Sequence, residues 1–232
     1  MKPSVKLYNS VDHSNRKTIL GLTEYNKATK FLDVGCSSGE FTKEVAAKIG
    51  TKEVYGIELM EDLVQNSRDK GIITYQANLN KEFPIENESF DFVCANQVIE
   101  HLLETDIFIR EAYRVLKKGG YAIISTNNLA SIHNIVSLIL GKQPFSCHVS
   151  NEVVVGLLFK SWHMEFKGRG GVHLRIFTYA GLKELLEYHK FKVEKVVGVG
   201  YYPFTGKIGG ILSWLDKRHS VYLTMKVRKE VK

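Results

Sequence analysis

Short apolar runs alternate with longer segments of helical periodicity through the first half of the chain. The apolar runs have the length of buried strands, and they lie at residues 31–35, 54–58, 72–76, 90–95 and 121–125. Between them, apolar residues recur every three or four positions, which predicts helices at residues 40–49, 59–70 and 102–116. Parallel strands need a crossover, usually a helix. The alternation therefore predicts a doubly wound parallel sheet.

The last third of the chain departs from this pattern. A helix is predicted at residues 178–189 and strands at 192–199 and 221–227, with no obvious full crossover helix between these two strands. Strands without a crossover pair antiparallel, so we expect that pairing at one edge of the sheet. The predicted fold class is α/β, with a Rossmann-like, doubly wound, mostly parallel seven-stranded sheet that has an antiparallel edge strand.

Composition places the chain among packed globular proteins. Hydrophobic residues make up 44% and charged residues 25% of the 232 residues, which excludes a disordered or low-complexity chain. The longest strongly apolar stretch, residues 135–140, is far shorter than the ~20 residues of a membrane span. No apolar run follows the N-terminus as in a secretory signal, and three cysteines do not make a disulfide framework. We therefore expect a cytoplasmic protein.

The formal net charge of +7 is unevenly distributed. Residues 160–232 carry 15 Lys and Arg against 6 Asp and Glu, whereas residues 1–159 carry 17 against 19. A basic last third is compatible with nucleic-acid or anionic-membrane binding. These basic residues are scattered along the sequence rather than clustered, which favours a solvated face.

The turn after the first predicted strand indicates a ligand-binding loop. In open α/β sheets, ligands bind at the carboxyl ends of the strands, and Asp33, Gly35 and Gly39 lie at this position. Glycine allows a sharp turn and close approach of the backbone to a ligand. The spacing differs from the Gly-x-Gly-x-x-Gly pattern of dinucleotide sites, and no Gly-Lys-Ser/Thr of a P-loop follows.

Polar residues at the ends of the next three strands strengthen this indication. Glu58 ends the second strand, where a carboxylate can accept hydrogen bonds from both ribose hydroxyls. Asn78 follows the third strand and could accept from an adenine amino group, although a turn role is the alternative. Asn96 follows the fourth strand. Suitable groups at four strand ends together are a stronger signal than any one of them.

Four segments together resemble the ordered motifs of class I S-adenosylmethionine-dependent methyltransferases. They are FLDVGCSSG at residues 31–39, YGIE at 55–58, FDFVCANQVIEHL at 90–102 and EAYRVLKKGG at 111–120. The nearest subgroup is the small type-11 kind, which includes ubiquinone- and menaquinone-pathway enzymes. Close matching covers residues 31–126, and HLRIFT at 173–178 extends it loosely. The resemblance implies S-adenosylmethionine as cofactor and S-adenosylhomocysteine as product, but says little about the acceptor.

Transferred residue by residue, the resemblance implies a complete cofactor site. Asp33 and Gly35 would lie by the methionine part, Gly39 would allow close packing, and Glu58 would hold the ribose. Asn78, where many relatives have aspartate, and the amide of Leu79 would contact the adenine, with Asn96 near the transferable methyl. The full expected set is Asp33, Gly35, Cys36, Gly39, Glu58, Leu59, Asn78, Leu79 and Asn96.

Candidate catalytic residues follow the fourth strand. His101 is the best-placed general base if the acceptor is a hydroxyl that must lose a proton, and a pocket-shaping role is the alternative. His173 and Arg175 are expected to face the acceptor, or to lie at a strand edge. Some quinone-pathway relatives bind a divalent cation through Glu-x-x-Glu-His, but here Gln97 replaces the first carboxylate. His148, His163, His173 and Cys147 match no zinc spacing, so no metal is expected.

The elements group into one domain, residues 1–232. Residues 1–30 are expected to form an N-terminal cover, 31–126 the cofactor-binding core and 173–232 the C-terminal helix and edge strands. Residues 129–172 interrupt the alternation of strands and helices, and they are expected to form an acceptor lid. The aromatic residues of this segment are Phe145, Phe159, Trp162 and Phe166. The apolar helix expected at 129–140 is a core or lid element, and it also allows peripheral membrane contact.

The leading hypothesis is a methyltransferase acting on a small-molecule or lipid- or glycan-linked acceptor, at oxygen rather than nitrogen or carbon. An RNA or DNA methyltransferase is the first alternative, but the Asn/Asp-Pro-Pro-aromatic loop and the Pro-Cys nucleophile of such enzymes are both absent from the sequence. We therefore do not expect a nucleic-acid partner. A non-catalytic S-adenosylmethionine-binding module is the second alternative. A nicotinamide dehydrogenase is disfavoured, because the glycine spacing of this sequence differs from that of a dinucleotide site. The sequence does not predict an oligomeric state.

Overall fold

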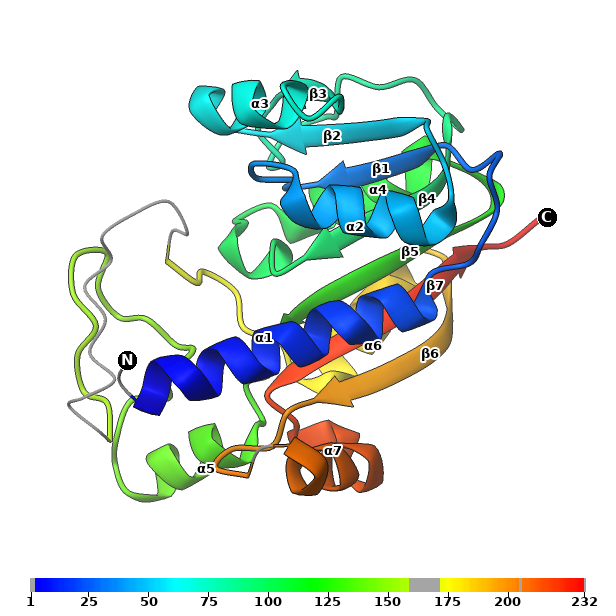
Figure 1. Ribbon diagram of the computed structural model, residues 1–232. Coiled ribbons are helices and arrows are strands. Elements are labelled where there is room, and N and C mark those ends of the chain that lie inside the picture. The colour runs from blue at the N-terminus through cyan, green and yellow to red at the C-terminus, as the bar shows by residue number, and fades with distance from the viewer. Residues whose placement is uncertain (1–2, 159–171, 205, 232) are drawn as a thin grey trace.

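The computed structural model describes residues 3–158, 172–204 and 206–231, with the side chains of residues 3–8 excepted. Its centre is a single seven-stranded sheet with the strand order β3-β2-β1-β4-β5-β7-β6 (Figure 1). The strands are β1 (Phe31–Val34), β2 (Val54–Glu58), β3 (Ile73–Gln76), β4 (Phe90–Asn96), β5 (Leu116–Asn127), β6 (Phe191–Val199) and β7 (Tyr222–Lys229). The first five strands pair parallel, which confirms the predicted doubly wound sheet.

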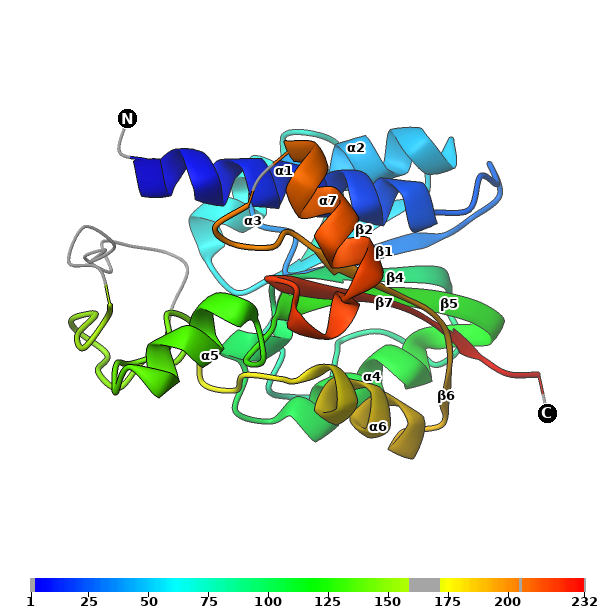
Figure 2. The same ribbon diagram turned by 90° about the horizontal axis from the view of Figure 1, so that it is seen from below.

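Helices cover both faces of this sheet (Figure 2). They are α1 (Pro3–Leu22), α2 (Glu40–Ile49), α3 (Glu61–Arg68), α4 (Thr105–Val115), α5 (Ile132–Ile139), α6 (Tyr179–Tyr188) and α7 (Gly206–Leu215), with short 3₁₀ turns η1 (Ile99–His101) and η3 (Lys217–His219). Helices α1, α2 and α3 lie on one face and α4 and α6 on the other. The strands are apolar on both faces because each face is buried.

Alternate residues of the central strands enter two separate cores. Phe31, Phe92 and Tyr121 stack across β1, β4 and β5 beneath α1 and α2, with ring centroids 4.9 and 4.4 Å apart. On the opposite face, the side chains of Leu32 and Val93 pack with those of α4 and α6. This double core holds the carboxyl ends of the strands in a fixed register, and the candidate site is built there.

The last two strands pair antiparallel at one edge, as predicted. The antiparallel strand itself is β7, which lies between β5 and the edge strand β6. A ten-residue helix, α7, lies between β6 and β7, where no full crossover helix was expected. Glycines weakened its pattern in the sequence; one of them, Gly209, packs so closely that a Cβ there would lie 2.5 Å from the carbonyl oxygen of Phe204.

Two other boundaries differ from the sequence prediction. The helix expected from residue 102 begins at Thr105, after η1, and the strand expected from residue 121 begins at Leu116. Leu116 already pairs with Phe90, and an irregularity in the register between Phe90 and Phe92 accommodates the intervening polar residues. The basic, glycine-containing segment predicted to close the helix therefore lies within the strand.

Candidate active site

The carboxyl ends of β1 to β4 bring together the residues that the sequence predicted for the cofactor. Gly35 follows β1, Glu58 ends β2, Asn78 follows β3 and Asn96 ends β4. The four strands are adjacent and parallel, so their ends lie in a row at one edge. Doubly wound sheets bind their ligands at this edge.

The first turn depends on glycine at two positions. Gly35 and Gly39 have φ angles of 77° and 85°, in the left-handed region that favours glycine. A Cβ at Gly35 would lie 2.5 Å from Val98 Cγ2, and a Cβ at Gly39 would lie 2.5 Å from Ile72 Cδ1. Glycine is therefore required at both positions, by the backbone conformation and by the close packing of the loop against Val98 and Ile72.

Asp33 is a buried carboxyl group at the centre of this row. Its Oδ2 accepts a hydrogen bond from Thr42 Oγ1 at 2.6 Å. Burial raises the pKa of Asp33 to about 7, the hydrogen bond from Thr42 opposes this rise, and the nearby charge of Glu58 adds to it. A positive charge placed beside Asp33 would favour its ionised form.

Glu58 organises the backbone around it. One carboxylate oxygen, Oε2, accepts from the amide of Ser37 at 3.0 Å. The other, Oε1, accepts from the amides of Leu59 and Met60 at 2.7 and 3.0 Å. No lysine, arginine or histidine within the described ranges forms an ion pair with Asp33 or Glu58. Two neighbouring carboxylates without a cationic side chain suit a ligand that carries positive charge.

The remaining predicted cofactor residues have different environments. The side-chain oxygen of Asn78 accepts from the backbone and side-chain nitrogens of Asn80 at 2.9 and 3.1 Å, so it supports a turn. Leu79 is buried in the core, whereas Leu59 beside Glu58 exposes 58% of its surface. Burial raises the pKa of Cys36 to about 12, which keeps this thiol neutral. An exposed leucine next to Glu58 offers an apolar surface to a planar ring.

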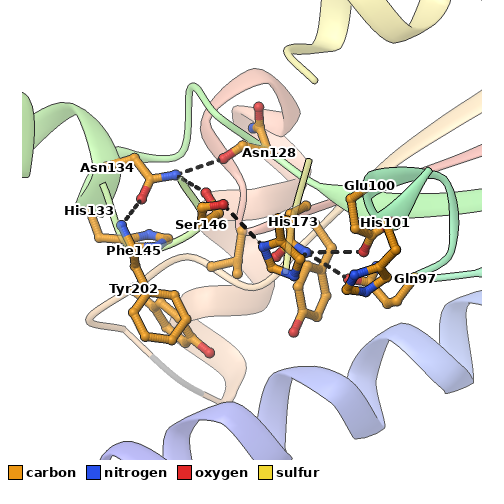
Figure 3. Close-up of a pocket in the computed structure, with 13 residues that line it drawn as sticks. Gln97, Glu100, His101, Asn128, His133, Asn134, Phe145, Ser146, His173 and Tyr202 are labelled. Atoms are coloured by element: carbon orange, nitrogen blue, oxygen red, sulfur yellow. Dashed lines mark hydrogen bonds between the residues drawn. The ribbon is translucent and has the colours of Figure 1, made fainter. Parts of the chain in front are cut away.

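A separate cavity of about 100 Å³ lies beyond β4 and β5, and we call it the histidine cavity (Figure 3). It is lined by Gln97, Glu100, His101, Asn127, Asn128, His133, Asn134, Phe145, Ser146, His173, Tyr202, Val221 and Tyr222. The rings of His101 and His173 lie 4.9 Å apart. The cavity adjoins the cofactor row at β4, because Asn96 ends that strand and Gln97 follows it directly.

The two histidines differ in how their nitrogens are used. His173 Nδ1 lies 3.0 Å from the carbonyl oxygen of Ser146 and its Nε2 lies 3.4 Å from Asn127 Nδ2, so one nitrogen donates and the other accepts. His101 Nδ1 lies 3.2 Å from the carbonyl oxygen of Val172. Because a carbonyl oxygen can only accept, His101 carries its proton on Nδ1, and Nε2 keeps its lone pair.

Burial keeps His101 and His173 neutral near pH 7. It lowers the pKa of His101 and lowers that of His173 to about 4, and the neighbouring histidines lower the latter further. Burial also raises the pKa of Glu100 to about 7, against hydrogen bonds from Thr126 Oγ1 and Asn127 Nδ2. One potential metal-binding atom from each of Glu100, His101 and His173 lies within 4.8 Å of the other two. These three side chains could therefore bind a cation together.

Arg175 does not line this cavity, and of the aromatic residues of the predicted lid only Phe145 belongs to the part of the chain that the structure describes. Arg175 is exposed and its guanidinium lies 3.4 Å from the carbonyl oxygen of Leu103. Phe145 does line the histidine cavity. Phe159, Trp162, His163 and Phe166 lie outside the described residues.

An apolar pocket of about 220 Å³ adjoins the histidine cavity and shares His133, Phe145 and Tyr202 with it. Its other walls include Val136 of α5, Leu157 and Pro203. A polar cavity continued by an apolar pocket can accommodate a molecule with a polar head and an apolar tail.

Asn15 is a central residue that the sequence analysis missed. It is fully buried on α1, and its Nδ2 donates to Asn96 Oδ1 at 2.9 Å. Its Oδ1 accepts from Ser125 Oγ at 3.1 Å and from Thr224 Oγ1 at 2.8 Å. The signal was present in the sequence: Asn15 lies four residues after Val11 and four before Ile19, in phase with the buried face of the helix.

Replacing Asn15 with alanine should lower the free energy of unfolding by about 1–2 kcal/mol, because the buried hydroxyls of Ser125 and Thr224 and the half-buried Asn96 amide each lose one hydrogen bond. Chemical denaturation measures this change. The neighbouring exposed Ser14 is the matched control, and Ser14→Ala should change stability by less than about 0.5 kcal/mol. Equal effects of the two substitutions would show that the Asn15 network contributes nothing of its own.

Comparisons with known proteins show which proteins this chain is similar to. Residues 32–124 match the family model described as a methyltransferase domain, of type 11. The mitochondrial ubiquinone biosynthesis O-methyltransferase of Rattus norvegicus is 27% identical over 86% of this chain and 53% of its own length. The demethylmenaquinone methyltransferase of Staphylococcus aureus is 30% identical over 47% of each chain. The chain thus spans about half the length of these curated relatives.

A solved structure extends the likeness to the whole fold. The S-adenosylmethionine-dependent methyltransferase of Thermotoga maritima superposes with a TM-score of 0.63, at 19% identity, over 97% of this chain and 92% of that one. The fold is that of class I methyltransferases. Residues 32–124 match an S-adenosylmethionine-dependent methyltransferase domain of type 11, and the chain is similar to quinone-pathway methyltransferases over about half of their length.

Proposed function

We propose that the protein transfers a methyl group to a hydroxyl oxygen of a small-molecule or lipid-linked acceptor, with His101 as the general base. The observation that carries this proposal is the Nε2 of neutral His101, which forms no hydrogen bond with any residue that the structure describes, in a cavity that adjoins the cofactor row. The related ubiquinone-pathway enzyme is named as an O-methyltransferase, which supports oxygen as the target atom.

The cofactor row fits S-adenosylmethionine through its charges and its shape. When bound, this cofactor supplies a methyl group on a cationic sulfur. Asp33 and Glu58 would face its positive charge, and Glu58 would accept from the ribose hydroxyls. The backbone at Gly35 and Gly39 would pass close to it, and Leu59 would cover its adenine. Asn96, held by Asn15, would lie where the two halves of the site meet.

The histidine cavity would bind and deprotonate the acceptor. His101 Nε2 would accept the hydroxyl proton while Nδ1 stays hydrogen-bonded to the Val172 carbonyl, which fixes the ring. His173 uses both nitrogens in contacts with protein groups, so we assign it to orienting the acceptor. The apolar pocket would take an acceptor tail. Residues 129–172 would then serve as the lid that excludes water.

Two measurements test this function. Calorimetric titration with S-adenosylmethionine, S-adenosylhomocysteine and NAD should show micromolar binding of the first two and none of NAD. A coupled assay for S-adenosylhomocysteine should then show turnover with a catechol carrying an isoprenoid tail, and a higher KM for the same catechol without the tail. Binding without turnover on either catechol or on the corresponding amine would favour a non-catalytic module, and turnover on the amine alone would contradict transfer to oxygen.

A further inference from the structure

Helix α7 exposes its large apolar side chains and buries its small residues. Trp214 is 80% exposed, and Ile208, Ile211 and Leu215 are 58–68% exposed. The residues that α7 buries are Gly209 and Ser213, and the Ser213 hydroxyl is hydrogen-bonded within the helix to the Gly209 carbonyl. A helix at the surface of a globular protein normally turns its apolar side toward the core. The arrangement in α7 is the reverse.

Helix α5 shows the same reversal. Its buried residues are Asn134 and Ser137, whereas Ile139 is 77% exposed and Leu138 is 57% exposed. Asn134 is held inside by hydrogen bonds to the Asn128 carbonyl and to Ser146 Oγ, so this orientation of the helix is fixed. An exposed apolar surface on two helices exceeds the scattered single residues that are normal for a soluble protein.

The two helices lie at the same end of the molecule. Both lie away from β3 (Figure 1); α7 lies beside the edge strand β6, and α5 lies beyond the carboxyl end of β5 (Figure 2). The apolar pocket is walled on one side by α5 and on another by Tyr202 and Pro203, which lie shortly before α7 in the sequence. We call the exposed apolar side chains of α5 and α7 the helical face.

The charged residues of α5 and α7 and of the segments that flank them in the sequence are almost all basic. Lys207, Lys217 and Arg218 are exposed at the two ends of α7, and Lys142 is exposed just after α5. The sequence contains no Asp or Glu in residues 112–151 or 195–215. Asp216 follows α7, and its carboxylate is bonded to His219 Nδ1 at 2.7 Å and Tyr201 OH at 2.9 Å.

We propose that the helical face docks on an anionic lipid surface. Exposed aliphatic and tryptophan side chains flanked by Lys and Arg are the combination that binds the interface of a bilayer. A second copy of this chain would instead bring the same positive charges against each other, which disfavours a symmetric dimer through this face. Among the described residues, no helix combines the length and the hydropathy that crossing a bilayer requires.

Vesicle binding tests the proposal without any substrate or cofactor. The full-length protein should co-sediment with vesicles that contain phosphatidylglycerol at least about tenfold more strongly than with vesicles of phosphatidylcholine alone. Added salt should weaken this binding. The chain has two tryptophans, so Trp162→Phe leaves Trp214 as the only reporter, and its emission should shift to the blue on anionic vesicles.

Paired variants distinguish binding through the helical face from nonspecific adsorption to vesicles. Lys217→Glu with Arg218→Glu should reduce binding about tenfold or more, whereas Lys43→Glu with Lys48→Glu, the same charge change on α2, should reduce it far less. Trp214→Ser should reduce binding about tenfold, and Ile73→Ser, an exposed isoleucine on β3, should leave it unchanged. Circular dichroism and melting temperature confirm that each variant is folded.

Three outcomes would overturn the proposal. The first is equal binding of anionic and neutral vesicles. The second is equal loss in the α7 and α2 charge variants. The third is a concentration-dependent dimer, seen by light scattering, that Trp214→Ser dissociates in the absence of lipid. All three are independent of methyl transfer, so the proposed function stands or fails separately.

Discussion

Replacing His101 with glutamine should lower kcat by about 10²–10⁴-fold, the usual contribution of a positioned general base. Glutamine keeps a donor for the Val172 carbonyl and a similar size, but its amide cannot take a proton near neutral pH. The affinity for S-adenosylmethionine should stay unchanged, because His101 lies in the histidine cavity and not in the cofactor row. Steady-state kinetics and calorimetric titration measure the two quantities.

The same histidine predicts how activity depends on pH. A protonated base cannot accept the hydroxyl proton, so kcat/KM should fall as the pH drops through the pKa of His101. Burial lowers that pKa, which places the fall below pH 6.5 and leaves the enzyme active at neutral pH. The His101→Gln variant should lose this part of the profile.

Two further variants test whether His101 or another titratable group is the base. His219→Gln, at a half-buried histidine bonded to Asp216, should keep kcat and the pH profile. Glu100→Gln tests the neighbouring carboxyl group, whose pKa is raised to about 7 by burial. A fall near pH 7 that persists in His101→Gln but disappears in Glu100→Gln would assign the base to Glu100. A kcat that is nearly normal in His101→Gln would leave His101 only a pocket-shaping role.

Local patterns in the sequence were sufficient for the sheet and for the cofactor row. The strand runs are apolar because both faces are buried, and the ligand residues follow them directly in the sequence. The predicted positions of Gly35, Glu58 and Asn96 at the strand ends are therefore confirmed as positions, whereas their contacts with a cofactor stay predictions. Because the strands are neighbours and parallel, the residues at their carboxyl ends lie together, and the strand pattern is enough to predict this.

The histidine cavity could not be found in the same way, because it joins segments that are distant along the chain. His101 follows β4, His173 precedes α6, and Ser146 comes from the interruption after β5. Hydrogen bonds bring them together, including those from the amides of Leu174 and Arg175 to the Glu100 carbonyl at 2.7 and 3.1 Å. Pairing of this kind has no period in the sequence. Helix α7 was missed for a different reason, since its glycines lower the helix propensity of the segment, although close packing requires glycine at Gly209.

Replacing Glu58 with alanine should weaken S-adenosylmethionine binding by about 1–3 kcal/mol, a rise in Kd of about 5- to 150-fold. The substitution removes a carboxylate that would accept from the ribose, and it leaves the amides of Ser37, Leu59 and Met60 without their acceptor. Glu61→Ala, an exposed glutamate in the first turn of α3, is the matched control and should leave Kd unchanged. A lower melting temperature with an unchanged Kd would restrict Glu58 to a structural role.

Glu58 should also set the pH dependence of binding through Asp33. A cationic cofactor favours ionised Asp33, so affinity should rise as the pH increases through about 7, and binding near that pH should release protons. Because the charge of Glu58 contributes to raising the pKa of Asp33, Glu58→Ala should move this rise to lower pH as well as weaken binding. Calorimetry in two buffers of different ionisation enthalpy counts the protons released. A wild-type protein that releases none between pH 6 and 8 would show that Asp33 does not face the positive charge of the cofactor, since a carboxyl group with a raised pKa cannot gain such a neighbour without losing its proton.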